Sequence, residues 1–523
     1  MIRNTIYSIL VILLFIQQSA AQNKPYNIVF IVVDDLKPML HCYGETQMKT
    51  PNFDRLAKMG VSFTNAQVQQ AVCGPSRTSV LTGTYPDHNK DWDLDTNFRF
   101  SAPELISMPE YLISQGYTTT VTGKKVFHNG NVSEGHDAKS WSIPYKLADD
   151  FDPKYGTPAA RLYHNDSLNV LAKKYEEEAI QKGIKDQEGI DWFIFKKIMV
   201  SSEAADVSDE AYEDGIYASE AVERLSDLAK QSKPFFYGIG FSRPHLPFNA
   251  PKKYWDLYQR DEVPLAKFQD LVPNSPEFIY HTFGELRAYN DIDNNYNLTN
   301  KIPLDKQREL VHGYMASVSY VDAQLGKILD AIEINGLSKN TIIVVFGDHG
   351  YHLGDHAMWN KHSNFEQATR IPFIFAGPGI VKNKKVSQPV ELLDVFPTLF
   401  DLCGIEIPKQ ADGISIKNLL DNKKKTTIVK DFAMSQYPRH GDRMGYTIRT
   451  ERYRLTEWYK NGYNTNKEFS IDNIEFTELY DYENDPLETK NLINDSQYNL
   501  IKQELHQKLV QHLNTIHNKI NNK

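Results

Sequence analysis

A short stretch at residues 73–83 places a cysteine and an arginine where they could act together. It begins Cys-Gly-Pro-Ser-Arg and ends in Leu-Thr-Gly. Proline suits the first turn of a helix, because its missing N–H has no partner to lose there, and Ser76 can cap that turn. On such a helix Cys73 and Arg77 lie one turn apart on one face, and the positive N-terminus favours the thiolate of Cys73. The pattern predicts a reactive cysteine, although a lone cysteine is more often a buried, inert side chain.

Polar side chains that could hold a cation follow three apolar segments of the chain. Asp34-Asp35 and Asp348-His349 come at the ends of two of them, and His245 follows the third. Buried carboxylates require a cation or hydrogen-bond donors, and their oxygen atoms suit calcium or magnesium. Each feature also has a plainer interpretation: one aspartate of the pair could cap a turn, and His245, between two prolines, could be only a turn residue. Three such ends in one chain favour a shared site.

The elements that must position these side chains are helices and buried strands in alternation. Residues 27–33, 235–241, 341–346 and 371–376 are apolar runs rich in β-branched or aromatic side chains. Such runs are typical of strands buried on both faces of a parallel sheet, and sites form outside the carboxyl ends of those strands. The clearest helix is expected over residues 304–334. The alternation predicts an α/β sandwich around a large, mostly parallel central sheet.

The length, composition and net charge of the chain limit the class of protein. A chain of 523 residues with 41% hydrophobic and 24% charged residues is globular, and it suggests a large domain and a smaller one. The net charge of −9 argues against nucleic acids and other polyanions as general partners. Because the residue pattern changes after residue 440, we expect a catalytic domain over residues 22–440 and a smaller α+β domain over residues 441–523.

The N-terminus has the pattern of an export signal. Arg3 precedes an apolar run at residues 6–16, which is too short to span a bilayer comfortably, and small residues follow at positions 19–21. We expect a signal peptide over residues 1–21 and a mature protein that is soluble, free of the membrane, and periplasmic or secreted. An uncleaved anchor is the alternative.

Three cysteines are too few for a disulfide framework. If Cys73 is modified, Cys42 and Cys403 could pair. We favour two free thiols.

Longer strings around these residues carry a family resemblance. They are the stretch at residues 73–83, Arg-Pro-His-Leu-Pro-Phe at residues 243–248, and His-Gly-Tyr-His-Leu-Gly-Asp-His at residues 349–356, followed by Lys361 and Ser-Asn-Phe. These motifs resemble the type I sulfatases, and within them the iduronate-2-sulfatase branch, over residues 27–491. The resemblance implies an alkaline-phosphatase-like sandwich and a sulfuric ester hydrolase. It also implies that a formylglycine-generating maturation enzyme oxidises Cys73 to formylglycine.

The same resemblance implies a metal site beside Cys73. It assigns one divalent ion, calcium rather than magnesium, to Asp34, Asp35, Asp348 and His349, together with residue Cys73 itself. Many sulfatases have asparagine at the last of these positions, whereas the iduronate branch has histidine. Because nitrogen is an unusual ligand for calcium, His349 could instead lie behind the ligands.

The family mechanism assigns a role to each remaining residue. The hydrated formylglycine attacks sulfur through one hydroxyl group, and Arg77 orients the diol. Lys125 and Lys361 contact the sulfate and offset the charge that develops on its oxygens. His245 is the general acid for the departing sugar hydroxyl, and His128 helps the second hydroxyl to expel sulfate.

Some of these assignments have alternatives within the sequence. The chain reads Gly-Lys-Lys-Val-Phe-His, one residue longer than the family string, so Lys124 could replace Lys125 as the sulfate contact. His128 could be a packed structural histidine, and Lys361 alone would be an ordinary surface lysine.

The predicted activity is hydrolysis of sulfate esters in a sulfated carbohydrate. Uronate-containing or marine polysaccharide fragments such as those of ulvan are the expected partners. The rival interpretations are a phosphate or phosphonate ester hydrolase that shares the metal site, and a carbohydrate-binding protein in which Cys73 is never modified.

Overall fold

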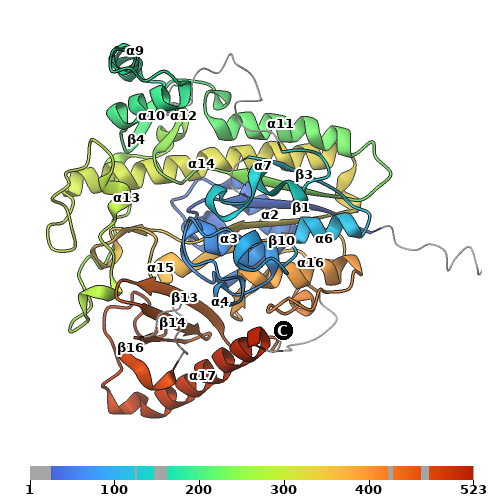
Figure 1. Cartoon of the computed structure of the whole chain (residues 1–523), viewed down its shortest axis with the longest axis vertical. Helices are drawn as coiled ribbons and strands as arrows, with labels where there is room; N and C mark the ends of the chain where they lie inside the picture. The colour runs from blue at the N-terminus through green and yellow to red at the C-terminus, as the bar shows by residue number, and fades with distance from the viewer. Residues whose placement is uncertain (1–24, 124–125, 146–161, 422–427, 461–469, 522–523) are drawn as a thin grey trace, which may run out of the picture.

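The computed structural model describes residues 25–123, 126–145, 162–421, 428–460 and 470–521. These residues form a layered α/β body and, against it, a smaller sheet with one long helix (Figure 1). The predicted signal peptide and both Lys124 and Lys125 lie outside the described residues. Among the helices within them, none is both long and apolar enough to cross a membrane.

The layered body is built on a sheet of eight described strands in the order β11-β2-β10-β7-β1-β5-β3, with β12 beside β2. The four strands β3 (Thr118–Thr122), β5 (Phe235–Phe241), β1 (Asn27–Val33) and β7 (Thr341–Gly347) are parallel. β10 (Arg370–Ala376) runs antiparallel to both β7 and β2 (Gly60–Gln67). Short β11 (Lys384–Val386) and β12 (Val390–Glu391) complete the edge. The predicted mostly parallel sheet is confirmed.

The pairing register of the strands brings the polar residues predicted at the strand ends to the same edge of the sheet. Val33, the last residue of β1, pairs with Phe241 of β5 on one side and Gly347 of β7 on the other. The residues that follow these three strands therefore leave the sheet side by side, as expected for carboxyl ends of parallel strands.

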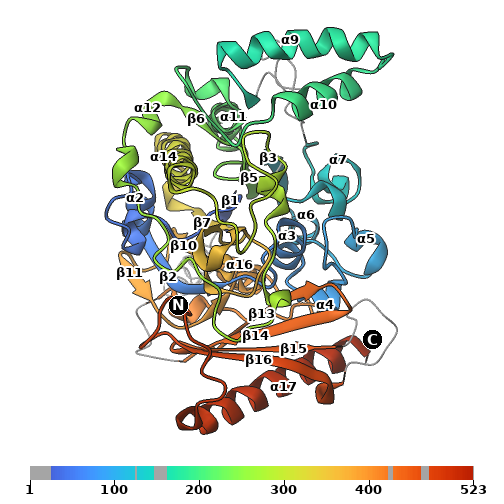
Figure 2. The same ribbon diagram turned by 90° about the vertical axis from the view of Figure 1, so that its left-hand side faces the viewer.

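Helices cover both faces of the sheet (Figure 2). One face packs against α14 (Leu304–Ile334), whose bounds match the prediction, together with α11 (Glu213–Leu228) and α2 (Pro51–Met59). The other face packs against α3 (Cys73–Thr82), α6 (Met108–Ser114) and α16 (Val395–Cys403). The strands β1, β5 and β7 are buried along their whole length, because each face is covered.

The smaller unit is an antiparallel sheet in the order β13-β14-β15-β16. Its strands are β13 (Ala433–Arg439), β14 (Arg443–Arg449), β15 (Tyr453–Tyr459) and β16 (Ile474–Asp481), and α17 (Asn499–Asn521) packs on one face. The backbone N–H of Gln436 donates to the carbonyl of Gln69 at 2.7 Å, which joins β13 to the layered body. The predicted division after residue 440 stays a prediction.

Candidate active site

Three carboxylates converge where β1 and β7 end. The N–H of Asp35 donates to Oδ1 of Asp348 at 3.0 Å, which links the two strand ends directly. Asp35 has φ 61°, a backbone conformation that is unfavourable for a residue with a side chain. The hydroxyl of Tyr314 donates to the carbonyl of Asp35 at 2.8 Å and holds this residue from α14. All three aspartates, Asp34 included, are fully buried.

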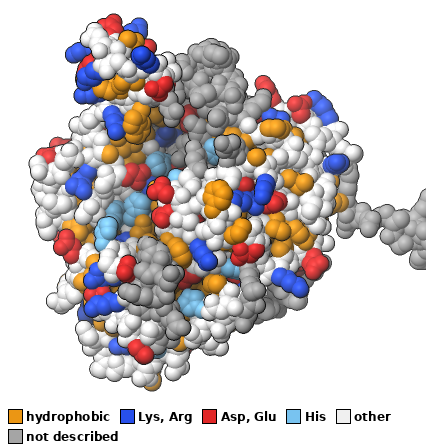
Figure 3. Space-filling model, viewed as in Figure 1, with side chains coloured by type: hydrophobic (Ala, Val, Ile, Leu, Met, Phe, Trp, Pro, Cys, Tyr) orange, Lys and Arg blue, Asp and Glu red, His pale blue; other side chains and the backbone are white. Residues whose placement is uncertain are grey.

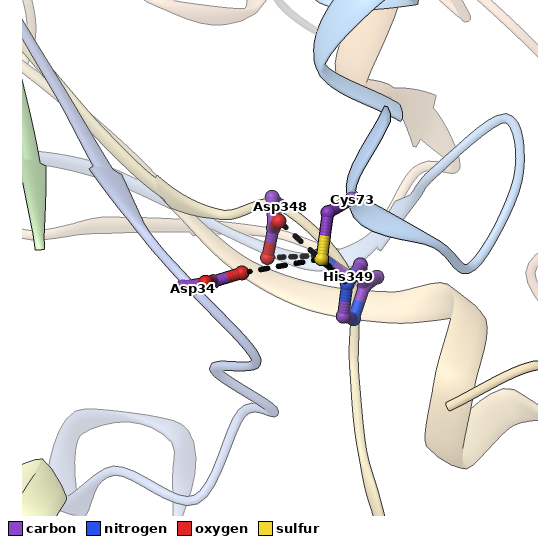
Figure 4. A group of neighbouring side chains, drawn as sticks. All are labelled: Asp34, Cys73, Asp348 and His349. Atoms are coloured by element: carbon purple, nitrogen blue, oxygen red, sulfur yellow. Dashed lines mark hydrogen bonds and ion pairs between the residues drawn. The ribbon is translucent and has the colours of Figure 1, made fainter. Parts of the chain in front are cut away.

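Helix α3 brings Cys73 to these carboxylates. Sγ of Cys73 lies 3.4 Å from Oδ1 of Asp34 and 3.3 Å from Nε2 of His349. Figure 4 shows Asp34, Cys73, Asp348 and His349 pointing toward one another. The Sγ atom of Cys73 is therefore surrounded by residues from the start of α3, the ends of β1 and β7, and the turn after β7.

Arg77 turns toward the same point, as its spacing from Cys73 predicts. Its Nε and Nη2 donate to Oδ2 of Asp348 at 2.9 and 2.6 Å, and Nη2 also pairs with Asp34. The predicted cap by Ser76 is wrong, because the N-cap residue is Val72 and makes no side-chain cap bond. The hydroxyl of Ser76 donates instead to the carbonyl of Asp348, so it ties α3 to the end of β7.

The expected thiolate character of Cys73 is also wrong. Burial raises the pKa of the Cys73 thiol well above its usual value, and the charge of Asp34 raises it further. The opposing effects of Lys361 and Arg77 on this pKa are smaller. Residue 73 as a plain cysteine is therefore a protonated thiol, which is a poor nucleophile.

The donor set of this cluster fits a divalent cation. Ligand atoms of Asp34, Cys73, Asp348 and His349 lie within 4.8 Å of one another, and so do those of Asp35, Cys73 and His245. Burial raises the pKa of Asp348, and the nearby charges of Asp34 and Asp35 act in the same direction against His349 and Arg77. Crowded carboxylate oxygens are the ligands that calcium and magnesium prefer.

Lys361 lies between the cluster and a carboxylate that the sequence did not reveal. Its Nζ is 3.0 Å from Oδ1 of Asp35 and 3.1 Å from Oε1 of Glu285. Glu285 belongs to α13 (Gly284–Arg287), a four-residue helix in an irregular part of the chain. Since it neither ends a buried strand nor belongs to a recognisable motif, no signal in the sequence singled it out.

His245 reaches the site from the loop after β5. Asp214 of α11 accepts hydrogen bonds from the backbone N–H groups of Ser242 and Arg243, each at 2.7 Å, and so fixes the start of this loop. Nε2 of His245 lies 3.0 Å from Oε1 of Glu285.

His128 lies at the start of a short 3-10 helix, Asn129–Asn131, where its Nδ1 accepts from the N–H of Gly130 at 3.3 Å. The roles predicted for His128 and for Lys125 stay predictions. Cys42 and Cys403 are free thiols, as expected.

A cavity of about 720 Å³ adjoins the cluster through Val72, the residue before Cys73. Aromatic side chains of Trp92, Tyr280 and Tyr437 line it, together with the imidazoles of His281 and His362. In Figure 3, histidine side chains gather near the middle of the face viewed there. Aromatic rings with polar edges are suited to packing against sugar rings.

The family model for sulfatases matches residues 26–405 of this chain. The chain belongs to the sulfatase family. A second model, described as N-sulphoglucosamine sulphohydrolase, C-terminal, matches residues 354–515 of this sulfatase. The enzyme is thus a sulfuric ester hydrolase, as predicted.

Named relatives agree with this assignment. Iduronate 2-sulfatase of Homo sapiens is 32% identical over 92% of this chain and 93% of its own. An ulvan-active sulfatase of Formosa agariphila is 27% identical over 94% of this chain and 82% of its own. The solved phosphonate monoester hydrolase of Agrobacterium radiobacter has the same fold, with a TM-score of 0.68 at 19% identity over 94% of this chain and 96% of that one. The predicted alkaline-phosphatase-like fold is confirmed.

Proposed function

We propose that this sulfatase removes sulfate esters from a sulfated carbohydrate with a formylglycine made from Cys73. The observation that carries the proposal is the convergence of Cys73 Sγ on Asp34 and His349, at 3.4 and 3.3 Å, inside a ring of buried carboxylates. A protonated, buried thiol has no evident role there, whereas the oxidised side chain would place oxygen atoms at the same point.

Two groups beyond the unmodified chain complete the proposed chemistry. Oxidised to formylglycine and hydrated, residue 73 supplies a hydroxyl group as the nucleophile. A divalent ion held by Asp34, Asp35, Asp348 and His349, for which we propose calcium, supplies positive charge for the sulfate oxygens and favours a deprotonated nucleophile.

The remaining side chains orient the ester and move protons. Arg77, fixed by Asp348, orients the hydroxyl groups at residue 73. Lys361 directs a buried ammonium group at the cluster and offsets charge that develops on the sulfate oxygens. His245 gives a proton to the departing sugar oxygen, and His128 assists the release of sulfate.

For the substrate we propose short oligosaccharides that contain a sulfated uronate or a related marine-type sugar. Support comes from the human iduronate 2-sulfatase and the ulvan-active relative, and from the aromatic walls of the cavity beside Val72. A pocket-type site would favour chain ends over the middle of a polymer, and equal activity on polymer and on short fragments would contradict this part of the proposal.

The test is the release of free sulfate from a panel of sulfated oligosaccharides. The enzyme is produced with a formylglycine-generating partner and calcium, beside Cys73→Ala. Release by the wild type and none by the variant supports the proposal, and equal release by both contradicts it. A matched sulfate and phosphate ester of one alcohol tests the rival activity, since a preference for the phosphate would favour a phosphate or phosphonate hydrolase.

Export to the periplasm or the medium is part of the same proposal. It rests on Arg3 and the apolar run that follows. The mass of the mature N-terminus tests it: a chain that starts near Gln22 supports cleavage of the signal, and an intact Met1 in cell extracts contradicts it.

A further inference from the structure

The cavity beside Val72 is lined by segments that lie far apart in the sequence. Residues 92–95 and 280–282 come from segments before α14, and residues 437–442 come from the turn between β13 and β14. Because Val72 precedes Cys73, this cavity is where a sugar unit next to the sulfated one would lie. The side chains that line it therefore bear on which neighbouring unit the enzyme accepts.

Arg439 fixes the turn between β13 and β14 against the segments before α14. Its Nε donates to the carbonyl of Phe278 at 2.8 Å, and its Nη2 donates to the carbonyls of Ile279 and His362 at 2.9 and 2.7 Å. The guanidinium also lies over the ring of Tyr437, 4.6 Å from the ring centroid. These contacts hold the turn in place, and they occupy N–H groups of Arg439 with carbonyl oxygen atoms of the protein.

Three aspartates that line the cavity are exposed and have no cationic partner within the described part of the chain. They are Asp93, Asp95 and Asp442. Oδ1 of Asp93 accepts the N–H groups of Asp95 and Thr96 at 2.9 and 2.7 Å, so only backbone donors serve it. Among the described residues that line the cavity, Arg439 is the one lysine or arginine. The lining therefore carries more negative than positive charge.

These carboxylates are not arranged as a metal site. Among the described residues, the groups of acidic, histidine and cysteine ligand atoms within 4.8 Å of one another include Asp34 and Asp35 but none of the three aspartates of the cavity. Separate carboxylates accept hydrogen bonds from hydroxyl groups, and an aromatic ring such as that of Trp92 packs against the C–H groups of a sugar. A sulfate or carboxylate on the same sugar is instead repelled.

His281 adds an unused neutral donor to this lining. Its Nδ1 accepts the N–H of Phe283 at 3.0 Å, so the proton of the neutral ring is on Nε2. Burial and the charge of His362 lower the pKa of His281 well below its usual value, which keeps the ring neutral. Nε2 is buried and has no hydrogen-bond partner among the residues that the structure describes. An oxygen atom of a bound sugar would satisfy this donor.

We propose that this cavity binds an uncharged sugar unit joined to the sulfated one and disfavours a second anionic group there. The inference rests on the proposed function, which places the sulfate at residue 73. At that residue, Arg77, Lys361 and the proposed cation offset the charge of the sulfate, whereas in the cavity carboxylates accept the hydroxyl groups of the neighbouring unit. The substrate class is thus an oligosaccharide in which a neutral sugar adjoins the sulfated one.

The first test measures binding in the cavity without sulfate release. The calcium-loaded, formylglycine-containing protein is made with 5-fluorotryptophan, and Trp92→Phe assigns the ¹⁹F signal of residue 92. Methyl β-glucoside and methyl β-glucuronide, which differ by the carboxylate at C6, are titrated separately. We expect the glucoside to bind about tenfold more tightly, as one pair of like charges near a protein surface implies. Equal affinities, tighter binding of the glucuronide, or no shift with either glycoside would overturn the inference.

The test variant combines Asp95→Asn with Asp442→Asn, which removes two exposed carboxylates from the lining and leaves the proposed catalytic residues unchanged. We expect its affinity for the glucuronide to approach that for the glucoside. The matched control combines Asp261→Asn with Glu262→Gln, which removes two charges from the 3-10 helix Arg260–Glu262, outside the cavity. The control should keep the selectivity of the wild type. A test variant that also keeps it would contradict the role of the carboxylates.

Sulfate release then tests the same preference in substrates. Two disaccharides carry the sulfated unit that the oligosaccharide panel identifies, one linked to glucose and the other to glucuronate. We expect kcat/KM to be about tenfold higher for the glucose disaccharide, and the ratio to be smaller in the test variant. Equal values would overturn the inference and leave the proposed function intact. Selective binding of the glucoside would support the inference even if no member of the panel is cleaved.

Discussion

Two buried groups of carboxylates in this molecule are satisfied in different ways. At the ends of β1 and β7, Asp34, Asp35 and Asp348 surround one point in space and face only two described cationic side chains, Arg77 and Lys361. Near the start of α16, Glu391 and Asp394 pair with one lysine, Lys430. Neutral donors serve both groups: Asp348 accepts from the backbone N–H groups of Asp35 and His349, each at 3.0 Å, whereas three neutral donors serve the two carboxylates of the second group. These are Tyr85 Oη, Met434 N and Ile414 N, at 2.8, 2.9 and 2.9 Å.

The difference separates a reacting site from a structural one. In the second group, hereafter the Lys430 cluster, every carboxylate is surrounded by donors of the protein itself, and His512 of α17 reaches it through Tyr85 at 2.9 Å. In the first group, three carboxylates share Arg77 and Lys361 and crowd around residue 73, an arrangement that a further cation would stabilise. Bonds within the protein therefore hold the C-terminal helix, whereas we propose that a divalent cation completes the site at residue 73.

The largest contrast is expected from Asp348→Asn at the reacting site. Loss of this carboxylate should lower kcat/KM by more than about 100-fold, the upper value for a residue that only supports a metal ligand. The folded state should be retained, because the change relieves repulsion among the carboxylates and Arg77 keeps its pair with Asp34. Sulfate release and a denaturation curve on one preparation check both points, and an unfolded variant would contradict the second.

Lys430→Met should have the opposite effect. It leaves Glu391 and Asp394 buried without their cation, which should lower the free energy of unfolding by about 3–5 kcal/mol. The fraction that remains folded should keep the wild-type kcat. A loss of kcat in fully folded protein would show that the two groups are not independent.

Removal of the cation should distinguish the two groups in a single protein. A calcium chelator should abolish sulfate release and lower the free energy of unfolding by about 2.7 kcal/mol relative to calcium at 100 times its Kd. Added calcium should restore both. The same decrease should occur in Lys430→Met, since that cluster needs no ion.

A smaller effect is expected from Asp214, a buried carboxylate that supports the site without belonging to it. Burial raises its pKa to about 6, against opposing effects of Arg243 and two backbone N–H groups. Because the folded pKa lies above the unfolded one, the protonated form favours folding, and this contribution is lost as pH rises from about 4 to about 6.

Asp214→Asn removes that titration. The stability of the wild type relative to this variant should therefore fall by about 2–3 kcal/mol across the window, since one pKa unit corresponds to about 1.4 kcal/mol. Urea denaturation at both pH values measures the change. A constant difference would contradict the raised pKa.

The apolar strands and the residues at their ends could be predicted because burial on both faces leaves an unbroken pattern. The strand β2 was not predicted, since Ser62, Asn65 and Gln67 interrupt its apolar residues. Its neighbours explain the polarity: Asn65 donates to the carbonyl of Thr450, and Gln67 donates to Glu366. Residues distant in the sequence supply the hydrogen-bond partners of these polar side chains, so no local sequence pattern indicates the strand.

Site residues that lie both in motifs and at strand ends were predicted correctly. Residues whose role depends only on packing in three dimensions were missed or misjudged. Glu285 comes from a four-residue helix, and its importance follows only from the atoms it contacts. For Cys73, the helix start correctly indicated the position. Burial and the neighbouring carboxylates then raised the pKa of its thiol, an effect that depends on β1 and β7 being close.

The central claim is that residue 73 acts as formylglycine among the carboxylates. The most direct test compares preparations made with different amounts of the maturation enzyme, in which mass spectrometry gives the fraction of residue 73 converted. We predict that the rate of sulfate release rises in proportion to that fraction and is zero for the unconverted thiol. A preparation with only the thiol at residue 73 that releases sulfate at the full rate would contradict the account.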